Sequence, residues 1–396
     1  MSASRAWVEE RFPLKALISL GRDENIVGGS SFFYTLGSAT LFVFLLQVVT
    51  GICQCFYYTP SIDHAYASLM WMRTEVPFGW LVHGLHYWGA NLMVVLVGVH
   101  LLRVFVWGAY KNPRQLVWLS GLVLMILTIL TEFTGAPLPW DEAGYWVAVV
   151  GTGIASAVPL IGPFTGNVLR GGGTMGPLTL SRFFVLHAAI FPATIVLMAV
   201  VHMAAFRMFG SVGPWRQERR KTTAPFWPDQ IFKDAVVATF LFLLLVFLSA
   251  YVTPPITGPA DPTDTTFKPQ PEWNFLFLFE ALKFLPGKLE PLGTVGVPSL
   301  VFIALGGLPF YDRNPDRDPA KRPLALLGMT ILVGFVGSFT IVAARGAARV
   351  ATAGAFGLGR RAGHRRAVDG CAAGRNGVAP AEAAARPPWP RGDDDR

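Results

Sequence analysis

The stretch FGWLVHGLHYWGANLMVVLVGVHLLR, residues 78–103, decides the fold. It is apolar over the length that a helix needs to cross a bilayer, and it carries His86 and His100 fourteen residues apart. At about 100° per residue, fourteen steps return to within roughly 40° of the same helix face. A helix over this stretch therefore directs two imidazoles to one side, about 21 Å apart along its axis.

A second apolar segment carries a matching pair, His187 and His202, fifteen residues apart. Fifteen steps return to within roughly 60° of one face. Two such helices can clamp two stacked metal centres, each held from both sides, which is a layout for moving electrons across a membrane. A histidine in a span can instead serve only as a hydrogen-bond partner between helices. Because an ionisable residue there is costly, four at paired spacing favour metal ligation.

The composition is that of a membrane protein. Of the 396 residues, 52% are hydrophobic and 15% are charged, with a mean hydropathy of +0.44, whereas soluble domains carry about 25% charged residues. The sequence predicts an all-α membrane protein, a four-helix bundle followed by three further transmembrane helices. The seven apolar runs of spanning length lie at 32–56, 80–107, 115–135, 183–208, 234–252, 295–310 and 324–344.

Basic residues indicate the orientation in the membrane. Lys and Arg cluster before the first span and in the loops 103–114, 207–221 and 313–322, whereas the alternate loops are poor in them. The positive-inside rule then predicts a multi-pass protein of the bacterial cytoplasmic membrane with a cytoplasmic N-terminus. The net charge of +8 reflects these loops, so no nucleic-acid partner is expected.

Three parts are expected along the chain. Residues 1–215 form an N-terminal four-span domain, residues 216–345 a C-terminal three-span domain, and residues 346–396 a tail rich in Ala, Gly and Arg. The composition of the tail predicts disorder or an aberrant C-terminus, and we assign it no function. The three cysteines of the chain are too few for a four-ligand metal site.

The topology pairs the histidines by depth. The second and fourth spans both run from the outside to the cytoplasm, so His86 and His187 share the outer level and His100 and His202 the inner one. Zinc would need four ligands in one cluster, which the axial separation of about 21 Å forbids. Two imidazoles leave no open coordination position, which suits haem used for electron transfer.

Glycines repeat the histidine interval on two other spans. Gly37 and Gly51 in the first span, and Gly121 and Gly135 in the third, are each fourteen residues apart. A flat macrocycle between helices needs positions where no side chain protrudes, so these glycines are predicted to make room for two haems. Ordinary close packing of helices is the alternative interpretation.

Four charged or titratable residues flank the predicted haem levels. Arg103, Arg114 and Arg182 lie near the membrane faces and are candidates to neutralise haem propionates, with snorkelling to lipid headgroups as the alternative. His83, three residues before His86, is expected as a propionate or hydrogen-bond partner and not as a ligand.

Three stretches carry a family resemblance: residues 78–103, LPWDEAGYWVAVVGTG at 138–153, and PLTLSRFFVLH at 177–187. Over roughly residues 10–340 the chain resembles the cytochrome b subunits of quinol:cytochrome c-type oxidoreductases. It is most similar to the chloroplast-type and related bacterial branch, which also has the fifteen-residue histidine interval. The two parts that are separate subunits in the chloroplast type are fused here.

The resemblance implies cofactors and an activity. Two non-covalent b-type haems are expected, the outer held by His86 and His187 and the inner by His100 and His202. Quinol would be oxidised at the outer face, and electrons would pass through both haems to a quinone near the inner face, coupled to proton translocation.

Pro271, Glu272, Trp273 and Asn274 are similar to the Pro-Glu-Trp-Tyr motif at the quinol-oxidation site of the family. Quinol oxidation releases two protons, and a glutamate at the rim of the site can accept one. Glu272 is therefore the candidate catalytic base, although a loop glutamate taken alone is usually a solvated charge. Asn274 replaces the tyrosine of the family, so a contact to quinol or to the iron–sulfur partner is expected to differ.

Two further positions depart from the family pattern. Thr35 stands where chloroplast-type members have the cysteine that attaches an extra haem, so no covalent haem is expected. His83 occupies the position of an arginine beside the outer haem. The implied partners are a Rieske iron–sulfur protein, a c-type cytochrome, quinol, the lipid bilayer and a second copy of the complex as a homodimer. Because the chain lacks a C-x-x-C-H haem-attachment motif and a Rieske motif, both proteins are expected as separate subunits.

Two other functions remain open from the residues. A dihaem membrane anchor of a dehydrogenase or hydrogenase would also pass electrons to quinone, but the 271–274 motif and the long 136–182 loop disfavour it. A transporter with buried histidines is disfavoured by the paired histidine intervals and the aligned glycines.

Overall fold

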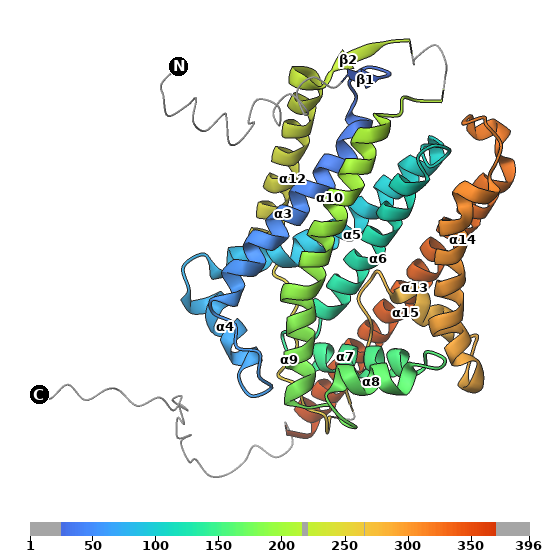
Figure 1. Cartoon of the computed structure of the whole chain (residues 1–396). Coiled ribbons are helices and arrows are strands. Elements are labelled where there is room, and N and C mark those ends of the chain that lie inside the picture. The colour runs from blue at the N-terminus through green and yellow to red at the C-terminus, as the bar shows by residue number, and fades with distance from the viewer. Residues whose placement is uncertain (1–24, 216–220, 265, 370–396) are drawn as a thin grey trace, which may run out of the picture. The chain divides into compact units, whose positions relative to one another are not determined.

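The computed structural model describes residues 25–215, 221–264 and 266–369, with side chains described up to residue 346. Figure 1 shows a bundle of long helices with shorter helices toward its lower end. The main elements in chain order are β1 (Asn25–Val27), α3 (Thr35–Cys55), α4 (Ala65–Glu75), α5 (Gly79–Val106), α6 (Gln115–Gly135), α7 (Glu142–Ser156), α8 (Gly162–Arg170), α9 (Pro177–Val185), the π-helical turn η2 (Leu186–Ile190), α10 (Phe191–Phe209), β2 (Thr223–Pro225), α12 (Ile231–Tyr251), α13 (Leu276–Leu282), α14 (Val297–Tyr311) and α15 (Pro323–Asp369).

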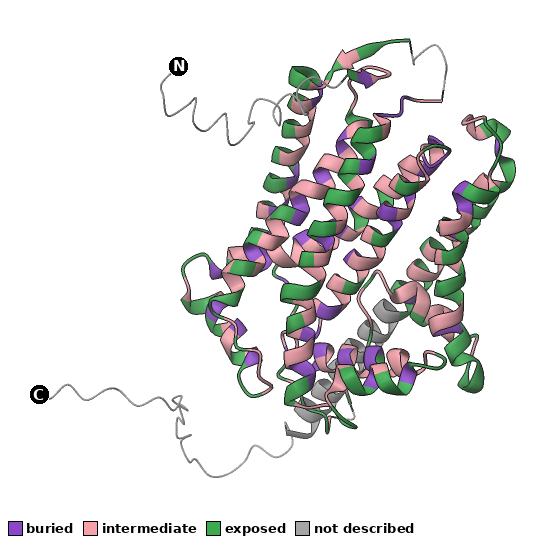
Figure 2. Cartoon of the chain, viewed as in Figure 1, coloured by how far each residue is buried: buried purple, intermediate pink, exposed green. Residues whose placement is uncertain are grey.

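Seven helices of the described chain are long and apolar enough to cross a membrane. Their number and order confirm the predicted all-α membrane fold, and the fourth to sixth spans begin earlier than expected. Figure 2 shows much exposed surface along these helices, and large apolar side chains such as Phe240 and Leu243 lie on it, as lipid contact requires. The spans are Phe32–Cys55, Gly79–Val106, Gln115–Gly135, Pro177–Phe209, Phe226–Tyr251, Gly287–Tyr311 and Pro323–Gly346.

The spans pair so that each histidine-bearing helix lies beside a glycine-bearing one. α3 packs along α5, and α6 packs along α10. α12 packs against α3 and α5, and α14 against α6. The predicted boundary near residue 215 thus falls before a helix that packs on the first bundle. The described residues up to 343 belong to one compact unit, and those from 344 to 369 belong to a second.

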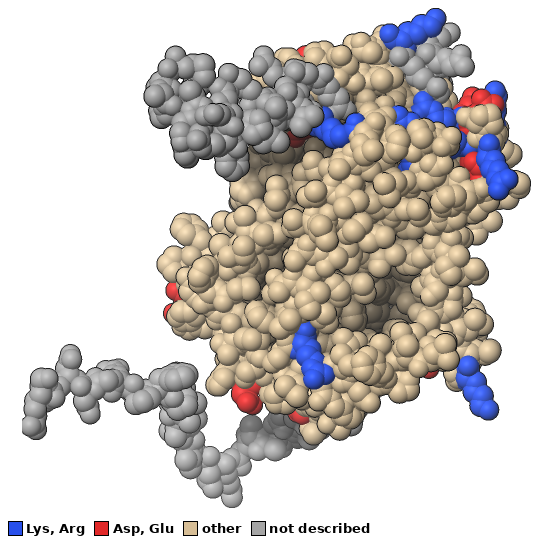
Figure 3. Space-filling model, in the orientation of Figure 1, with Lys and Arg blue, Asp and Glu red and all other residues tan. Residues whose placement is uncertain are grey.

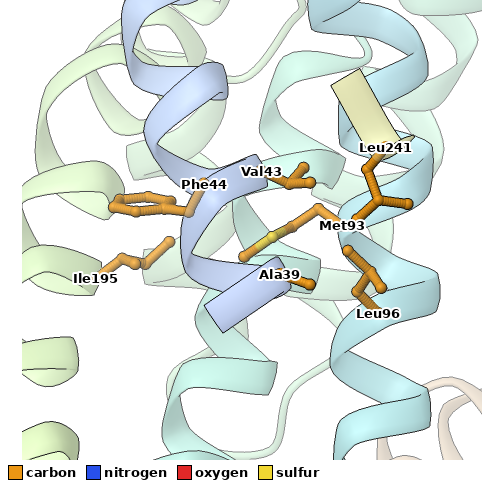
Figure 4. Packing of buried hydrophobic residues seen from close by; sticks show 7 residues of the cluster. All are labelled: Ala39, Val43, Phe44, Met93, Leu96, Ile195 and Leu241. Atoms are coloured by element: carbon orange, nitrogen blue, oxygen red, sulfur yellow. The ribbon is translucent and has the colours of Figure 1, made fainter. Parts of the chain in front are cut away.

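An apolar layer crosses the middle of the bundle. Met93 is seven residues from each histidine of α5, and Phe44 is seven residues from Gly37 and from Gly51. At 1.5 Å per residue the layer lies about 10 Å from each histidine level. It therefore separates the two levels. Its buried members are Ala39, Val43, Phe44, Met93, Leu96, Ile195 and Leu241 (Figure 4).

A buried polar network joins the first bundle to the last two spans at one end. Lys111 forms an ion pair of 2.9 Å with Asp312, and the Tyr110 hydroxyl donates to the same carboxylate. Arg322 donates to the Tyr110 hydroxyl and to two backbone carbonyls at the end of α5. Because a buried charge that loses its partner is strongly destabilising, this network fixes the loop after α14 on the loop after α5.

A second set of hydrogen bonds works at the opposite end. Asp141, just before α7, accepts from the backbone N–H and the hydroxyl of Thr257, both at 2.8 Å. The next residue, Glu142, accepts from the backbone N–H of Asp261 at 2.7 Å. These bonds hold the segment that leads to the Pro-Glu-Trp-Asn motif against the loop after α6.

The structure adds a short antiparallel strand pair, β1–β2, that the all-α prediction did not include. Asn25 pairs with Pro225, and Val27 pairs with Thr223. Strands of three residues carry too little alternation to be read from a sequence. The pair joins the segment before α3 to the connector before α12.

Candidate functional site

Three elements supply the four histidines. α5 carries His86 and His100, the π-helical turn η2 carries His187, and α10 carries His202. The imidazole centroids of His86 and His187 lie 6.0 Å apart with the ring planes inclined by 76°. His202 is among the neighbours of His100 in the structure. The structure therefore brings the histidines together in the two expected pairs.

The separation of the outer pair fits a shared metal ion. A metal–imidazole bond measures about 2 Å, so a centroid distance of 6.0 Å leaves room for one ion between the rings. In the described part of the chain, no three His, Cys, Asp or Glu side chains form a group that could hold a metal ion. The histidine chemistry is thus that of two-ligand pairs.

The π-helical turn explains the fifteen-residue interval. Within it the N–H of Phe191 bonds the carbonyl of Leu186, five residues earlier, where an α-helix would join residues four apart. Such a turn takes up one extra residue. The interval from His187 to His202 therefore behaves as fourteen α-helical residues, like the interval in α5, and both imidazoles reach one face.

Each of the four predicted glycines lies against one imidazole. A Cβ at Gly135, Gly121 or Gly51 would be too close to the imidazole, whereas one at Gly37 would make an ordinary contact. The space that the glycines leave is thus filled by the edges of the histidine rings. The distance from a Cβ placed on the glycine to the nearest imidazole carbon is 2.5 Å for Gly135 and His187, 3.1 Å for Gly121 and His202, 3.2 Å for Gly51 and His86, and 3.4 Å for Gly37 and His100.

Two hydroxyl groups fix the tautomer of two histidines. The Thr50 hydroxyl donates to a carbonyl one turn earlier in α3, so its oxygen accepts from His86 Nδ1 at 2.9 Å. The Ser120 hydroxyl is bound in the same way in α6 and accepts from His202 Nδ1 at 3.0 Å. With the proton on Nδ1, the Nε2 lone pair is free for a metal.

The other two histidines differ from each other. His187 Nδ1 donates to the backbone carbonyl of Thr131 at 2.8 Å. His100 Nδ1 is buried and has no hydrogen-bond partner among the described residues. Thr50 and Ser120 each precede a glycine, whereas the residue before Gly37 is Leu36, which has no hydroxyl. His100 therefore lacks the support that the other three histidines have.

The predicted arginines lie in different environments. The Arg103 guanidinium lies 3.9 Å from the centroid of Trp107, while its Nε and Nη2 are buried without a hydrogen-bond partner in the described chain. These two free donors beside His100 are what a buried propionate would satisfy. Arg114 donates to the Phe209 carbonyl at 2.6 Å and keeps a buried Nε without a described partner.

The remaining two flanking residues lie toward the outer end. Arg182 donates to the carbonyls of Asn167 and Val168 near the end of α8, so its charge is used there to cap a helix. His83 is buried, and its Nδ1 has no described partner. A role for either residue toward a propionate stays a prediction.

Two spans pin the Pro271–Asn274 motif. The Trp273 indole donates to Asn91 on α5, and the Asn274 side-chain amide donates to Glu132 on α6 at 2.9 Å. Glu272 is half-buried between these contacts. Burial, and secondly the charge of Asp141, raises the pKa of the Glu272 carboxyl.

A cavity of about 440 Å³ connects this motif to the outer histidines. Its lining includes the outer histidines His86 and His187 together with Glu272, Glu132 and Tyr87. Apolar side chains such as Ile195 and Met93 complete the wall. A flat apolar ligand with polar ends fits such a space.

Sequence reasoning missed two of these side chains, Glu132 and Asn91. Glu132 is the only charged residue in α6, and an ionisable residue in an apolar span is a functional candidate without further information. Asn91 carried no comparable signal, because its role depends on an indole 182 residues away.

Comparison with known proteins gives the family. Residues 23–210 match the family model "Cytochrome b/b6/petB", and residues 259–359 match "Cytochrome b(C-terminal)/b6/petD". Cytochrome b6 of Mastigocladus laminosus is 37% identical over 208 residues, which cover 52% of this chain and 97% of that protein. Cytochrome b6 of Acaryochloris marina (strain MBIC 11017) is 37% identical over 214 residues, 54% of this chain and 100% of that protein.

A solved structure agrees over the longer stretch. A chain of a "Hyperthermophilic respiratory Complex III" superposes with a TM-score of 0.76 and 26% identity, covering 86% of this chain and 91% of that chain. The two family models account for both halves of one polypeptide, so the predicted fusion and the predicted resemblance are confirmed. The chain belongs to the cytochrome b/b6 family and is a haem-bearing core subunit of a quinol oxidoreductase.

Proposed function

We propose that the chain binds two b-type haems, the outer between His86 and His187 and the inner between His100 and His202. The seating of all four imidazoles on glycines of neighbouring spans carries this assignment. When bound, the haems supply one-electron carriers at two depths of the membrane. The apolar layer around Met93 separates the two levels and excludes water between them.

Quinol is oxidised, in this proposal, in the part of the cavity next to the Pro271–Asn274 motif, and the outer haem would take the part between His86 and His187. The Glu272 carboxylate accepts a proton there, since burial beside Asp141 favours its protonated form. Trp273 and Asn274 hold the motif on α5 and α6, which keeps Glu272 at the rim of the cavity. One electron of each quinol leaves to a Rieske iron–sulfur protein, and the other crosses the chain toward a quinone near the opposite face.

The charge distribution supports an orientation. In Figure 3 the Lys and Arg side chains gather along the upper edge of the visible face, and only isolated ones lie at the lower edge. The upper edge is the end with the β1–β2 pair and the loop after α14 (Figure 1). The positive-inside rule places this end in the cytoplasm of a bacterium and the quinol cavity outside.

The partners follow from the reaction. A Rieske protein and a c-type cytochrome on separate subunits take the first electron, and a homodimer of the complex is expected. The neighbouring structure belongs to a respiratory Complex III, and the curated relatives are cytochromes b6. The absence of a covalent haem at Thr35 remains part of the proposal.

A reduced-minus-oxidised spectrum of the purified chain tests the haem assignment. Two b-type haems per chain are expected, and His187→Leu and His202→Leu should each lower the content to one. Loss of the same spectral component in both variants would contradict the pairing. A spectrum without b-type haem would overturn the proposal.

A measurement of quinol-dependent haem reduction distinguishes a quinol-oxidation site from a dihaem membrane anchor. Glu272→Gln should slow quinol-dependent reduction of the haems by about 100-fold, the lower end of the usual effect of a general base. An anchor that merely passes electrons to quinone would be insensitive to this change.

A further inference from the structure

A second cavity, of about 720 Å³, lies at the end of the bundle with the β1–β2 pair. Its walls come from four segments that are distant in sequence: β1, the loop after α5, the connector after α10 and the segment after α14. The described residues that line it include none of the four histidines and no residue of the Pro271–Asn274 motif. Haem binding and quinol oxidation therefore leave this cavity without a function.

The lining of this cavity is charged and mainly basic. Its described charged residues are the cations Lys111, Arg114, Arg317 and Lys321 and the carboxylates Asp316 and Asp318. The cations outnumber the carboxylates by four to two, and a concave surface with an excess of one charge attracts ligands of the opposite charge. The cavity therefore favours an anion over a cation.

Both carboxylates of the lining already have partners. Asp316 forms an exposed ion pair of 3.0 Å with Lys321. Asp318 accepts from a backbone N–H two residues later in the chain, at 3.0 Å. Lys111 belongs to the buried ion pair with Asp312 described above. The carboxylates of the lining are thus engaged by groups of their own segment, and neither forms an ion pair with Arg114.

Arg114 has no carboxylate partner among the described residues. Its Nη2 donates to the neutral Phe209 carbonyl, and its buried Nε has no described hydrogen-bond partner. A guanidinium carries five donors in a planar fork that matches the oxygens of a phosphate. Arg103, beside His100, has two buried donors for a haem propionate, so that role does not require Arg114. Arg317, which donates to the Gly213 carbonyl at 3.3 Å, adds a second guanidinium to the lining.

The cavity lies at the level of a membrane surface. Arg114 directly precedes the span Gln115–Gly135, and Arg317 lies between the span that ends at Tyr311 and the span that begins at Pro323. The phosphates of a bilayer are found at this level, and basic pockets beside transmembrane helices bind phosphate head groups there. Free phosphate from the adjoining water also reaches such a position.

We propose that this cavity binds a phosphate group, with Arg114 and Arg317 as donors and Lys321 as a further cation. The phosphate belongs to a membrane lipid or is free in solution, since both present the same oxygens to the guanidinium groups. The bound anion links the loop after α5 to the segment after α14 through charge. It does not depend on the quinol site.

Binding is measured on the delipidated, haem-loaded complex with three probes. Inorganic phosphate and dihexanoyl phosphatidylglycerol carry the phosphate, and dihexanoylglycerol lacks it. Binding of a phosphate-bearing probe should weaken as the ionic strength rises. Tighter binding of the phospholipid than of inorganic phosphate identifies a lipid head group, and equal or weaker binding identifies free phosphate. Binding of neither, or equal binding of dihexanoylglycerol and the phospholipid, overturns the proposal.

Two charge variants should change the affinity in opposite directions, which a folding defect cannot imitate. Lys321→Gln removes a cation and should weaken binding by up to about 5-fold, as expected of a partly exposed ion pair. Asp316→Asn removes a carboxylate and should tighten binding by a similar factor. The matched control is Lys283→Gln, because Lys283 also pairs with a glutamate and is 58% exposed against 59% for Lys321, but does not line the cavity. Unchanged affinity in both variants, or an equal change in the control, overturns the proposal.

Arg114→Gln tests the central donor. Loss of a charge-assisted hydrogen bond should weaken binding of the probe by at least about 10-fold. The midpoint potential of the inner haem is measured on the same variant. An unchanged affinity together with a shifted potential would show that Arg114 serves a propionate instead, which overturns its place in this site.

Discussion

The outer and inner histidine levels have nearly the same sequence spacing but different surroundings. At the outer level both imidazoles have an Nδ1 acceptor, and the cavity beside them ends at two glutamates. At the inner level His202 is supported by Ser120, while His100 has no described Nδ1 partner and lies beside the free donors of Arg103. The two histidine pairs are thus alike in spacing, and what distinguishes them is the set of groups around each pair.

Deletions in the fourth span should produce the largest difference. Deleting Ala189 removes the extra residue of the π-helical turn, so both levels should keep their haems. Deleting Ala199, in the regular α10, turns His202 by about 100° away from its present direction and should cost one haem. The haem content per chain, measured spectroscopically, checks this, and equal losses would show that the π turn does not carry the register.

The pH dependence of Glu272 should affect only the outer level. Burial and Asp141 raise the pKa of this carboxyl, and the base acts when deprotonated. The quinol-oxidation rate should therefore rise with pH through a range above the ordinary glutamate value of about 4.3.

Two variants test whether this rise of the quinol-oxidation rate with pH is caused by deprotonation of Glu272. In Glu272→Gln the rate should no longer rise with pH, and at high pH it should be about 100-fold below that of the unaltered protein. Asp141→Asn should move the rise to lower pH because the charge that raises the pKa is gone. Steady-state rates across pH measure both, and electron exchange between inner haem and quinone should be unchanged.

Alanine substitutions of the glycines should destabilise the outer level more than the inner one. An alanine Cβ at Gly135 would lie 2.5 Å from the His187 ring, whereas one at Gly37 would lie 3.4 Å from the His100 ring, an ordinary contact. Gly135→Ala should destabilise the protein by about 1–3 kcal/mol, as overpacking does, and Gly37→Ala by less than about 1 kcal/mol. Thermal unfolding of the haem-loaded protein measures both, and a reversed order would contradict the seating of the rings.

Hydroxyl groups next to the glycines should give the smallest effects. Thr50→Val and Ser120→Ala remove one hydrogen bond of about 1 kcal/mol, which corresponds to a shift of about 40 mV for one electron. The midpoint potential should rise, because a less basic imidazole stabilises ferric haem less.

The inner level offers the reciprocal change. Leu36→Thr places a hydroxyl before Gly37, as Thr50 stands before Gly51, and should lower the inner potential by a similar amount. Redox titration of each haem measures these shifts. An unchanged inner potential would show that His100 gains nothing from a neighbouring acceptor.

Much of the fold followed from local pattern. Apolar length predicted seven spans, and the single-residue difference between the two histidine intervals already marked α9–α10 as unusual. The sequence pattern could not predict that a π-helical turn takes up the extra residue, because the stability of such a turn depends on packing against α6. The sequence did not predict the β1–β2 pair either, since its strands are distant in the chain: Asn25 and Pro225, which pair, are 200 residues apart.

The site divides in the same way. Similarity to a family motif predicted Glu272 and Asn274 as site residues. Glu132 was not predicted, although it is the only acidic residue in its apolar segment. The partner of Asn274 is 142 residues away, so its amide could be placed only by the tertiary structure. Arg182 was predicted near a membrane face, and the structure adds a hydrogen bond from it to a carbonyl in α8, a contact that no spacing predicts.

By itself the sequence determined the number of spans, the four histidines with their glycines, and the family to which the chain belongs. Helical periodicity and hydrophobic length are local properties, so they can be read along one segment at a time. Only the tertiary structure decided which oxygen accepts from Nδ1 of His86, that Nδ1 of His100 has no partner among the described residues, and that two glutamates line one cavity. Those features arise where helices distant in sequence meet, and their chemistry is set by burial and hydrogen-bond partners that no single segment contains.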